Sequence, residues 1–437
     1  MTTRLTGDET ALWEAAARVL DANWTGTATI PSPGLYPHQW SWDSAFVCMG
    51  LARHRRDRAE QELLSLFRGQ WADGLLPHIV FNRTLARHAY FPGPELWRSD
   101  RQPGAPRGVH TSGLTQPPLH ALAALRLHEC AHPSEAERSR AFLQRLYPML
   151  VEQHRYLAQS RDLCSSGLMS ICHPWESGLD NSPAWDDPLS AVQPPPAHYT
   201  RRSHPTGEDY DRYVWLVTLL RESGYGTGYL RDAHPFAVED PLVNATYLAS
   251  THALAELAQI IGRDPVPHQE RAQRIHRALL DRLWDCDAGC FRARDIRADT
   301  LLPVVTVTAF APLLDPELPT PHVRNLVDLL LSARFAGAAG YPVPTCDLQA
   351  PTFDRHAYWR GPTWVNTNWL LWLGALGHGL GVIADLLYGS TLRLVRQSGF
   401  REFFDPFDGS GHGSHDYSWS AALILDLLGA RRAPQAA

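Results

Sequence analysis

The chain has 437 residues and a formal net charge of −6; 44% of its residues are hydrophobic and 20% are charged. This balance is typical of a globular protein and excludes an extended disordered chain. All 40 basic residues are arginines, and they form no stripe of the kind that binds a phosphate backbone, so nucleic acid is not an expected partner. No apolar run approaches the ~18–20 residues that cross a membrane.

The N-terminal segment and the cysteines together indicate a reducing compartment. Acidic residues interrupt the segment 1–20, where a signal peptide needs an apolar stretch. The seven cysteines are odd in number and scattered, which is typical of free thiols. Only Cys286 and Cys290 are closely spaced, and no second pair with histidine completes a zinc site. We therefore expect a cytoplasmic protein with no metal and no cofactor.

Apolar residues recur with a period of 3.6 through most of the chain, which predicts about a dozen helices. In chain order they are expected near 8–23, 42–54, 57–71, 113–130, 135–159, 207–223, 241–262, 265–284, 303–313, 321–333, 362–378, 380–398 and 416–430.

The predicted helices are of two kinds, and the difference indicates the fold. Segments 57–71 and 265–284 carry charges on one face, whereas 241–258 and 364–377 are apolar nearly all round. A helix that is apolar on every side must be buried on every side. Such helices alternating with amphipathic ones predict an all-α (α/α)6 barrel, in which an outer ring wraps an inner one. Strand signals are scarce, and the βαβ alternation of a β/α barrel is missing.

Five loops concentrate Trp, Tyr, His and acidic residues beside Pro and Gly, and fixed loops of this kind are where sites are built on a scaffold. They are LYPHQWSWD (35–43), AYFPGPELWR (89–98), HPWESGLDNSPAWDD (173–187), HAYWRGPTW (356–364) and FREFFDPFDGSGHGSHDYSW (400–419). We expect one catalytic domain over 1–437, in which long loops cover the mouth of the barrel. The insertions that form this cap are expected near 72–112, 160–206 and 399–415.

Aromatic rings beside carboxylates are typical of a carbohydrate site. The C–H face of a pyranose stacks on indole, while Asp, Asn, Gln and Arg bind its hydroxyls. Cleavage of a glycosidic bond also needs two carboxyl groups, one protonated and one ionised. The aromatic loops contain several acidic residues, and spacing alone does not choose among them: Asp43, Glu176, Asp180, Glu402, Asp405 and Asp416.

Several long motifs resemble those of glycoside hydrolase family 63, in the same order over essentially the whole chain. They are GLYPHQWSWDSAF, LPHIVFN, WESGLDNSPAW, AYWRGPTWVNTNWLLW and FREFFDPFDGSG followed by SWSAAL. Within that family, the length and the lack of a β-sandwich domain resemble the compact bacterial glucosylglycerate and mannosylglycerate hydrolases. The resemblance implies an (α/α)6 barrel that hydrolyses a small α-glucoside or α-mannoside with inversion.

The resemblance also implies the catalytic pair. Asp180, in the segment Glu-Ser-Gly-x-Asp, matches the family's general acid, and Glu402 matches its general base. Trp175 and its neighbours would exclude water from Asp180, and desolvation raises the pKa of a carboxyl group, which keeps it protonated near neutrality. Glu402, beside Arg401 and a Gly-rich loop, is expected to stay ionised. Inversion requires room for a water, so the two carboxyl groups are expected about 6.5–9.5 Å apart.

The same resemblance assigns further loop residues to substrate binding. The wall around the sugar ring is expected to contain Tyr36, Trp40, Trp42, Asp43, His78, Trp175, Tyr358, Trp359 and Trp364. Glycerate is an anion with hydroxyl groups, so its end of the site would need a cation and hydrogen-bond donors such as Tyr90, Gln116 and Tyr210.

One residue at the glycerate end departs from the family pattern. In RRSHPTGEDYDRY, His204 stands directly before Pro-Thr, where an arginine is expected. Two alternatives follow. Arg201, Arg202 or Arg212 supplies the positive charge, or the aglycone is neutral.

Other prominent residues have a structural interpretation. Trp369 and Trp372 lie on one long apolar helix, where core packing explains them better than contact with a sugar. Glu176 is interpreted as a hydrogen-bonded loop residue rather than a catalytic one. His412 and His415 lack clustered carboxylate or cysteine partners in the sequence, so we interpret them as loop histidines rather than metal ligands.

Two alternatives to a glycerate-specific hydrolase remain at this stage. The first is another inverting α-glucosidase, which is trehalase-like or acts on a neutral-aglycone glucoside. The second is a non-catalytic carbohydrate-binding protein, which would keep the tryptophans but lose an acid or a base. Terpene and lanthionine cyclases share the helical ring, but they need an Asp-rich motif or zinc ligands that the sequence lacks. The expected partner is a small sugar, with neither nucleic acid nor membrane; a homo-oligomer and the preferred hexose are left open.

Overall fold

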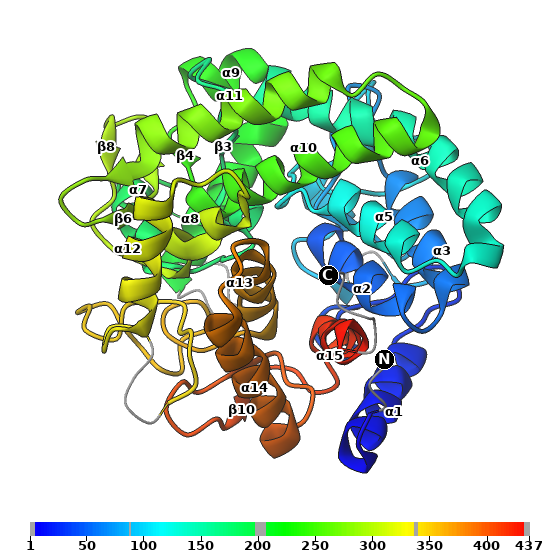
Figure 1. Ribbon diagram of the computed structural model, residues 1–437. Helices are drawn as coiled ribbons and strands as arrows, with labels where there is room; N and C mark the ends of the chain where they lie inside the picture. The colour runs from blue at the N-terminus through cyan, green and yellow to red at the C-terminus, as the bar shows by residue number, and fades with distance from the viewer. Residues whose placement is uncertain (1–4, 87–88, 197–206, 336–339, 432–437) are drawn as a thin grey trace.

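Six helical elements form a closed inner ring in the computed structural model, which describes residues 5–86, 89–196, 207–335 and 340–431. The ring consists of α2 (Ser41–Ala52), α5 (His120–Glu129), α10 (Pro241–Ile261), the 3₁₀ helix η7 (Val307–Leu314), α13 (Val365–Gly377) and α15 (Ser418–Ala430). Each element packs against the next in this order, and α15 packs against α2 (Figure 1). The ring is therefore closed by contacts between the two ends of the chain.

Six further helices form an outer layer around this ring. They are α1 (Gly7–Ala22), α3 (Arg56–Phe67), α6 (Ala136–Tyr156), α11 (Val266–Leu283), α12 (Thr320–Leu331) and α14 (Gly381–Ser398). Five of them pack against the inner element that precedes them in the chain, and α1 packs against the C-terminal α15. This arrangement is an (α/α)6 barrel, so the predicted fold class is confirmed.

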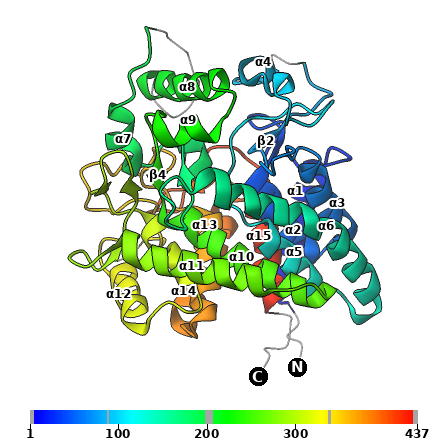
Figure 2. The ribbon, with the colours of Figure 1, turned by 90° about the horizontal axis from the view of Figure 1, so that it is seen from above.

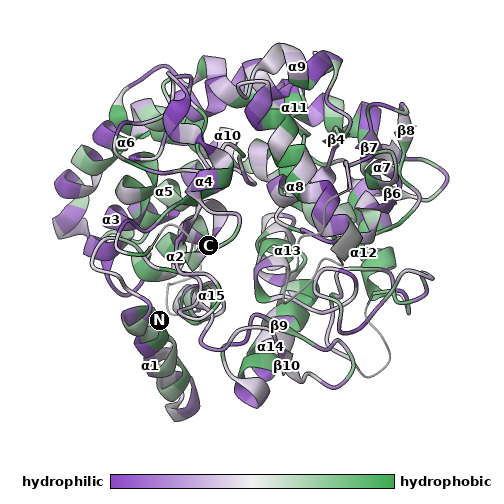
Figure 3. Ribbon diagram, turned by 180° about the vertical axis from the view of Figure 1, so that it is seen from behind, coloured by the Kyte–Doolittle hydropathy of each residue, from purple (hydrophilic) through white to green (hydrophobic). Residues whose placement is uncertain are grey.

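The burial of each layer follows from its sequence. Every residue of α2 is buried, as are most residues of α10, α13 and α15. In α11 the buried Ala272, Ile275 and Leu279 recur every three to four residues, so this helix covers the ring with a single face. Figure 3 shows hydrophilic residues on the outer helices α3, α6 and α11. The two kinds of helix predicted from the sequence correspond to the two layers.

Short strands hold the long loops together in small antiparallel sheets. Their bounds are β1 (Gln39–Trp40), β2 (Ile79–Val80), β3 (Ser170–Ile171), β4 (Val238–Glu239), β5 (Trp284–Asp285), β6 (Cys290–Phe291), β7 (Arg294–Asp295), β8 (Thr300–Leu301), β9 (Phe403–Phe404) and β10 (Gly411–His412). The described strands pair as β1-β2, β3-β4-β7-β8, β5-β6 and β9-β10. In the first sheet Trp40 lies opposite Ile79, and in the last His412 lies opposite Phe403.

The remaining helices lie in the segments between the ring helices, and all but α8 are short. The α-helices are α4 (Pro94–Trp97), α7 (Asp186–Ser190), α8 (Gly207–Glu222) and α9 (Thr227–Asp232). The other turns are η2 (Ser99–Arg101), η3 (Pro133–Glu135), the π-helical η4 (Leu157–Arg161), η5 (Pro174–Ser177) and η6 (Pro183–Trp185). Figure 2 shows α4, α8 and α9 on one side of the ring. Among the described residues, no helix combines the length and the apolar character needed to cross a membrane.

Two predicted helices differ from the structure for a physical reason. The helix expected over 113–130 begins only at His120, because Pro117 and Pro118 lack amide donors and exclude helical geometry before them. The helix expected over 303–313 is the 3₁₀ helix η7, which contains Pro312. Proline removes one bond of the α-helical ladder, and the tighter 3₁₀ geometry accommodates it over this short segment.

Candidate active site

An aromatic pocket of about 550 Å³, counting the space open to solvent at its mouth, lies at the N-terminal ends of inner helices. Trp42 and Asp43 belong to the first turn of α2, and Trp419 belongs to the first turn of α15. The structure brings most of the predicted site residues to its wall: Tyr36, Trp40, Trp42, Asp43, His78, Tyr90, Gln116, Trp175, Asp180, Tyr358 and Trp359.

Two predicted binding residues lie away from the pocket wall, and a third is outside the described residues. Trp364 is fully buried and stacks beneath Trp359, with ring centroids 3.6 Å apart and planes at 7°. Tyr210 lies behind Trp175, at a centroid distance of 6.3 Å. Neither of these two side chains is part of the pocket wall. His204 lies outside the described residues, as do Arg201 and Arg202.

The pocket wall also contains residues that the sequence analysis did not assign to the site: Ile79, Pro92, Gly178, Tyr417 and Trp419. Tyr417 comes directly before α15, and Trp419 is the second residue of this helix. This position matches that of Trp40 and Trp42 at the start of α2. Aromatic residues at the N-terminal end of an apolar inner helix thus mark the pocket wall in both helices. This pattern could have been found in the sequence.

The turn that carries Asp180 depends on a glycine. Gly178 follows η5 and has φ +74°, a left-handed conformation that favours glycine. A Cβ atom at this position would also lie 2.6 Å from the ring of Trp42. The glycine therefore allows the turn to approach the pocket wall closely, and Asp180 follows two residues later.

Polar contacts join the Asp180 turn to the loop at residues 356–364. Asn181 accepts a hydrogen bond from the backbone amide of Trp359 at 2.9 Å and donates one to the carbonyl of Ala357 at 3.2 Å. The Tyr213 hydroxyl donates to the backbone carbonyl of Asp180. Two loops that are far apart in the sequence are thereby held together in the wall of one pocket.

Glu402 lies between α14 and β9 and is 1% exposed. The Tyr36 hydroxyl donates to its Oε1 at 2.8 Å, and the backbone amide of Ser414 donates to its Oε2 at 2.8 Å. Burial raises the pKa of Glu402, while the hydrogen bonds from Ser414, Tyr36 and Tyr358 oppose this rise. Gly413 has φ +66°, and a side chain there would clash with the carboxylate of Glu402.

Arg401 was expected to favour the ionised form of Glu402, but its guanidinium binds other residues of the loop. Its guanidinium contacts the ring of His415 at 2.6 Å and donates to the carbonyl of Gly413 at 3.1 Å. The side chain points along the loop, because its neighbour Glu402 points inward to Tyr36. The donors that favour the ionised form of Glu402 are therefore hydroxyl and amide groups rather than the adjacent arginine.

Asp43 adds a third carboxyl group to the pocket. Burial raises its pKa well above the usual value, and the charges of Glu402 and Asp180 raise it further. Its Oδ1 atom is buried and has no hydrogen-bond partner among the described residues. An unpaired buried acceptor is costly, and a substrate hydroxyl would satisfy it.

Glu176 is the other acidic residue of the motif at 173–185, and both of its oxygens are bound by groups of the protein. Arg161 binds both of its oxygens, at 2.9 and 2.5 Å, and neither side chain is more than 1% exposed. The backbone amides of Thr115 and Cys172 also donate to it, at 3.1 and 2.7 Å. These contacts confirm the interpretation of Glu176 as a hydrogen-bonded loop residue.

Comparison with known proteins identifies the family of the chain. The family model described as "Mannosylglycerate hydrolase MGH1-like glycoside hydrolase domain" matches residues 36–420. The chain belongs to this family. A family relative, the mannosylglycerate hydrolase of Rubrobacter radiotolerans, is 40% identical over 426 residues, which cover 94% of this chain and 96% of the relative.

Two further relatives are also similar over nearly the whole chain. The glucosylglycerate hydrolase of Mycolicibacterium hassiacum is 36% identical over 443 residues, which cover 96% of this chain and 98% of the relative. The crystal structure of a GH63 mannosylglycerate hydrolase from Thermus thermophilus, in complex with Tris and D-glycerate, matches with a TM-score of 0.87 at 38% identity. That match covers 95% of this chain and 99% of the other. The MGH1-like protein described here is therefore an O-glycosyl hydrolase.

Proposed function

We propose that this MGH1-like enzyme hydrolyses a small α-glycoside, glucosylglycerate or mannosylglycerate, with inversion at the anomeric carbon. The observation that carries the proposal is the convergence of Asp180 and the Glu402 environment on one aromatic pocket. Relatives that span nearly the whole chain bear the names of mannosylglycerate and glucosylglycerate hydrolases, which supports this substrate class.

In the proposed mechanism Asp180 is the general acid and Glu402 the general base. Asp180 gives its proton to the glycosidic oxygen as the bond from that oxygen to the anomeric carbon breaks. Glu402 takes a proton from a water that attacks the same carbon from the opposite face. We expect the two carboxyl groups to be about 6.5–9.5 Å apart, because this mechanism needs room for the water.

The other groups of the pocket would hold the reactants in place. The hydroxyl of Tyr36 and the amide of Ser414 fix both oxygens of Glu402, which orients the base before substrate arrives. Asp43 would accept hydrogen bonds from sugar hydroxyls through its unpaired Oδ1. Trp175 and Trp359 supply aromatic surface for the C–H face of the ring.

We also propose that the chain acts as one catalytic domain over 1–437, whose insertions near 72–112, 160–206 and 399–415 cover the site. Residues of these segments line the pocket or contact the base: His78, Tyr90, Trp175, Asp180 and Ser414. Such a cover would exclude bulk water, so that only the water held by Glu402 competes for the sugar.

A neutral aglycone is a second candidate, and one observation favours it. Among the described residues that line the pocket there is no arginine. Binding of a glycerate carboxylate would then need a positive charge from elsewhere, and Arg201, Arg202 and His204 are outside the described residues. Glucosylglycerol, which has the same sugar but no carboxylate, distinguishes the two candidates.

A substrate panel tests the proposal. Purified enzyme is incubated with glucosylglycerate, mannosylglycerate, glucosylglycerol and trehalose, and proton NMR follows the anomer that is released first. We expect kcat/KM to be highest for a glycerate glycoside and the first product to be the β-anomer. Release of the α-anomer would contradict the mechanism. Preference for glucosylglycerol would contradict the glycerate assignment while leaving the catalytic pair intact.

A further inference from the structure

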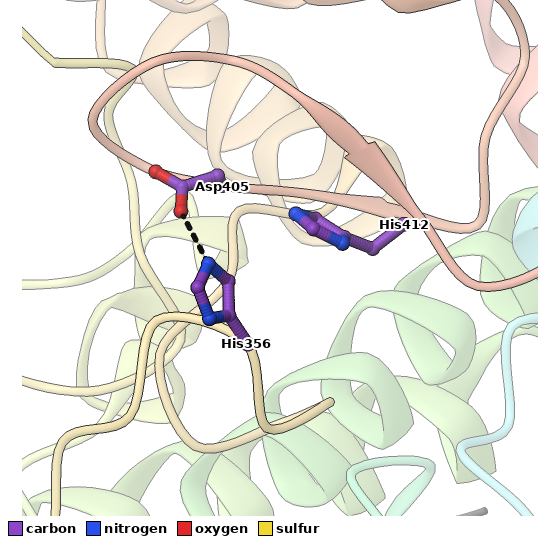
Figure 4. Close-up of side chains that lie close together, drawn as sticks. All are labelled: His356, Asp405 and His412. Carbon is purple, nitrogen blue, oxygen red and sulfur yellow. Dashed lines mark ion pairs between the residues drawn. The ribbon is translucent and has the colours of Figure 1, made fainter.

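Two histidines and one carboxylate meet beside the catalytic loops, at a place that the reaction does not use. His356 belongs to the loop before α13, whereas Asp405 and His412 belong to the β9–β10 hairpin. One ligand atom of each residue lies within 4.8 Å of the other two. Figure 4 shows His356 and Asp405 pointing at each other, with the ring of His412 beside them. His412 was interpreted from the sequence as a loop histidine, and the fold gives it two partners from distant positions.

The three potential ligands also have other polar partners: Arg355 pairs with Asp405, and Ser410 Oγ lies 3.2 Å from His412 Nε2. His356 Nε2 lies 3.2 Å from Asp405 Oδ2, and the His356 and His412 ring centroids are 5.2 Å apart. The side chain of His356 is 61% exposed, so it has room to rotate, while that of Asp405 is fully buried. His412 is fixed by a stacking contact with Phe403, at a centroid distance of 5.9 Å. Asp405 and His412 lie on one hairpin, and the exposed His356 has the most room to move toward an ion.

We propose that His356, Asp405 and His412 bind a divalent transition-metal ion of the Zn²⁺ class. Two imidazoles and one carboxylate are a donor set that suits Zn²⁺, Co²⁺ or Ni²⁺, whereas Mg²⁺ and Ca²⁺ prefer oxygen ligands only. A tetrahedral site with bonds of about 2.1 Å needs ligand atoms about 3.4 Å apart. Rotation of the exposed His356 side chain supplies the remaining approach, and water completes the coordination.

The neighbouring charges are compatible with a bound cation. Arg355 Nε pairs with Asp405 Oδ2, and Arg355 also contacts Asp408 at 3.0 Å. The backbone amides of Phe407 and Asp408 donate to Asp405 Oδ1, which fixes that carboxylate. Arg355 is 39% exposed and has Asp408 as a second partner, so an ion that takes Oδ2 leaves this guanidinium paired.

A bound ion would join two segments that carry the proposed catalytic groups. His412 lies opposite Phe403 in the β9–β10 pair, and Phe403 follows Glu402 directly in the chain. His356 precedes Tyr358 by two residues, and the Tyr358 hydroxyl is 3.1 Å from that of Tyr36, which donates to Glu402. The ion would thus fix the hairpin of the base relative to the loop of Tyr358. The ion would lie outside the sugar pocket, and it would affect the position of these two segments and the stability of the fold.

Direct metal binding tests the site without using activity, so its result is independent of the proposed substrate. Exposed Cys164 and Cys286 would bind Zn²⁺ adventitiously, so all variants carry Cys164→Ser and Cys286→Ser and have no affinity tag. Titration with Zn²⁺ is followed by calorimetry, and Co²⁺ is followed by its visible absorption. We expect one equivalent to bind, and His356→Ala and His412→Ala to weaken binding at least about tenfold.

Control variants and a second readout make the result decisive. His415→Ala changes a histidine of the same loop that contacts Arg401 rather than the cluster, and binding should be unchanged. Hydrogen exchange should slow in residues 353–360 and 403–412 when Zn²⁺ is added, and His356→Ala should abolish this slowing. Equal affinity in the parent and in both cluster variants, or no binding at millimolar Zn²⁺, would overturn the proposal. His356 is exposed, so its replacement leaves the fold intact.

Discussion

Glu176 and Glu402 are both buried glutamates in aromatic loops, yet their surroundings differ in one decisive respect. Glu176 is bound through both oxygens by the buried guanidinium of Arg161. Glu402 receives a hydroxyl from Tyr36 and an amide from Ser414, and its neighbour Arg401 turns to His415 instead. Arg161 occupies both oxygens of Glu176 with a compensating charge, whereas the hydroxyl and amide donors of Glu402 carry no charge.

This difference shows that burial alone does not identify a catalytic carboxylate. The partner decides: Glu176 joins the segments at 115, 161 and 172 to one another and is closed to other ligands. Glu402 lies beside the pocket, with donors that orient it but do not neutralise it. Four experiments test this contrast and the turn that carries Asp180, from the largest expected effect to the smallest.

Replacing either proposed catalytic group should have the largest effect on turnover. Asp180→Asn and Glu402→Gln are each expected to lower kcat by about 100- to 10,000-fold, since each removes a proton transfer from the transition state. Steady-state kinetics measure the loss, and circular dichroism checks that the fold is kept. Turnover within about tenfold of the parent in either variant would remove that residue from the mechanism.

Replacing Glu176 should instead reduce stability. Glu176→Gln leaves the Arg161 charge buried and unpaired, which is expected to lower the free energy of unfolding by about 3–5 kcal/mol. Urea denaturation measures this, and turnover per folded molecule should stay far above that of Glu402→Gln. Asp57→Asn is the matched control, because the Arg55–Asp57 pair is exposed and its loss should cost at most about 1 kcal/mol. Equal costs in the two variants would refute the structural role of Glu176.

The turn before Asp180 should tolerate no side chain at Gly178. Gly178→Ala combines a left-handed backbone with contact to the Trp42 ring, and it should lower the free energy of unfolding by about 2–3 kcal/mol. Gly379→Ala is the control, because Gly379 has φ +68° but open space around it, and it should cost only about 1 kcal/mol. Thermal denaturation of both variants measures the difference, which isolates the contact with Trp42. Equal costs would show that this contact does not constrain the turn.

Removing one hydroxyl should shift the pH dependence of the reaction. The base must be ionised, so kcat/KM falls as the pH falls through the pKa of Glu402. The Tyr36 hydroxyl lowers this pKa, so Tyr36→Phe should move the acidic limb of the profile to higher pH. Tyr90→Phe, another pocket residue, should leave the limb in place. A limb that stays unchanged in Tyr36→Phe would show that another group is the base.

Local patterns in the sequence predicted most helices, because helical burial is a periodic property of neighbouring residues. Residues 241–258 and 364–377 were expected to be buried on all sides, and they form the inner helices α10 and α13. Trp369 and Trp372 are buried there, as predicted for core residues. The start of α5 was placed too early because the helix was extended through Pro117 and Pro118, where the backbone is not helical.

The sequence by itself determined the fold class, the family resemblance and the aromatic loops, since these depend on periodicity and on motifs of adjacent residues. Only the tertiary structure decided which partners each polar group found. It paired Arg161 with Glu176, turned Arg401 away from Glu402, added Tyr417 to the pocket and brought His356 to Asp405. Such contacts join residues far apart in the chain, and the direction of a side chain depends on packing that no local pattern encodes.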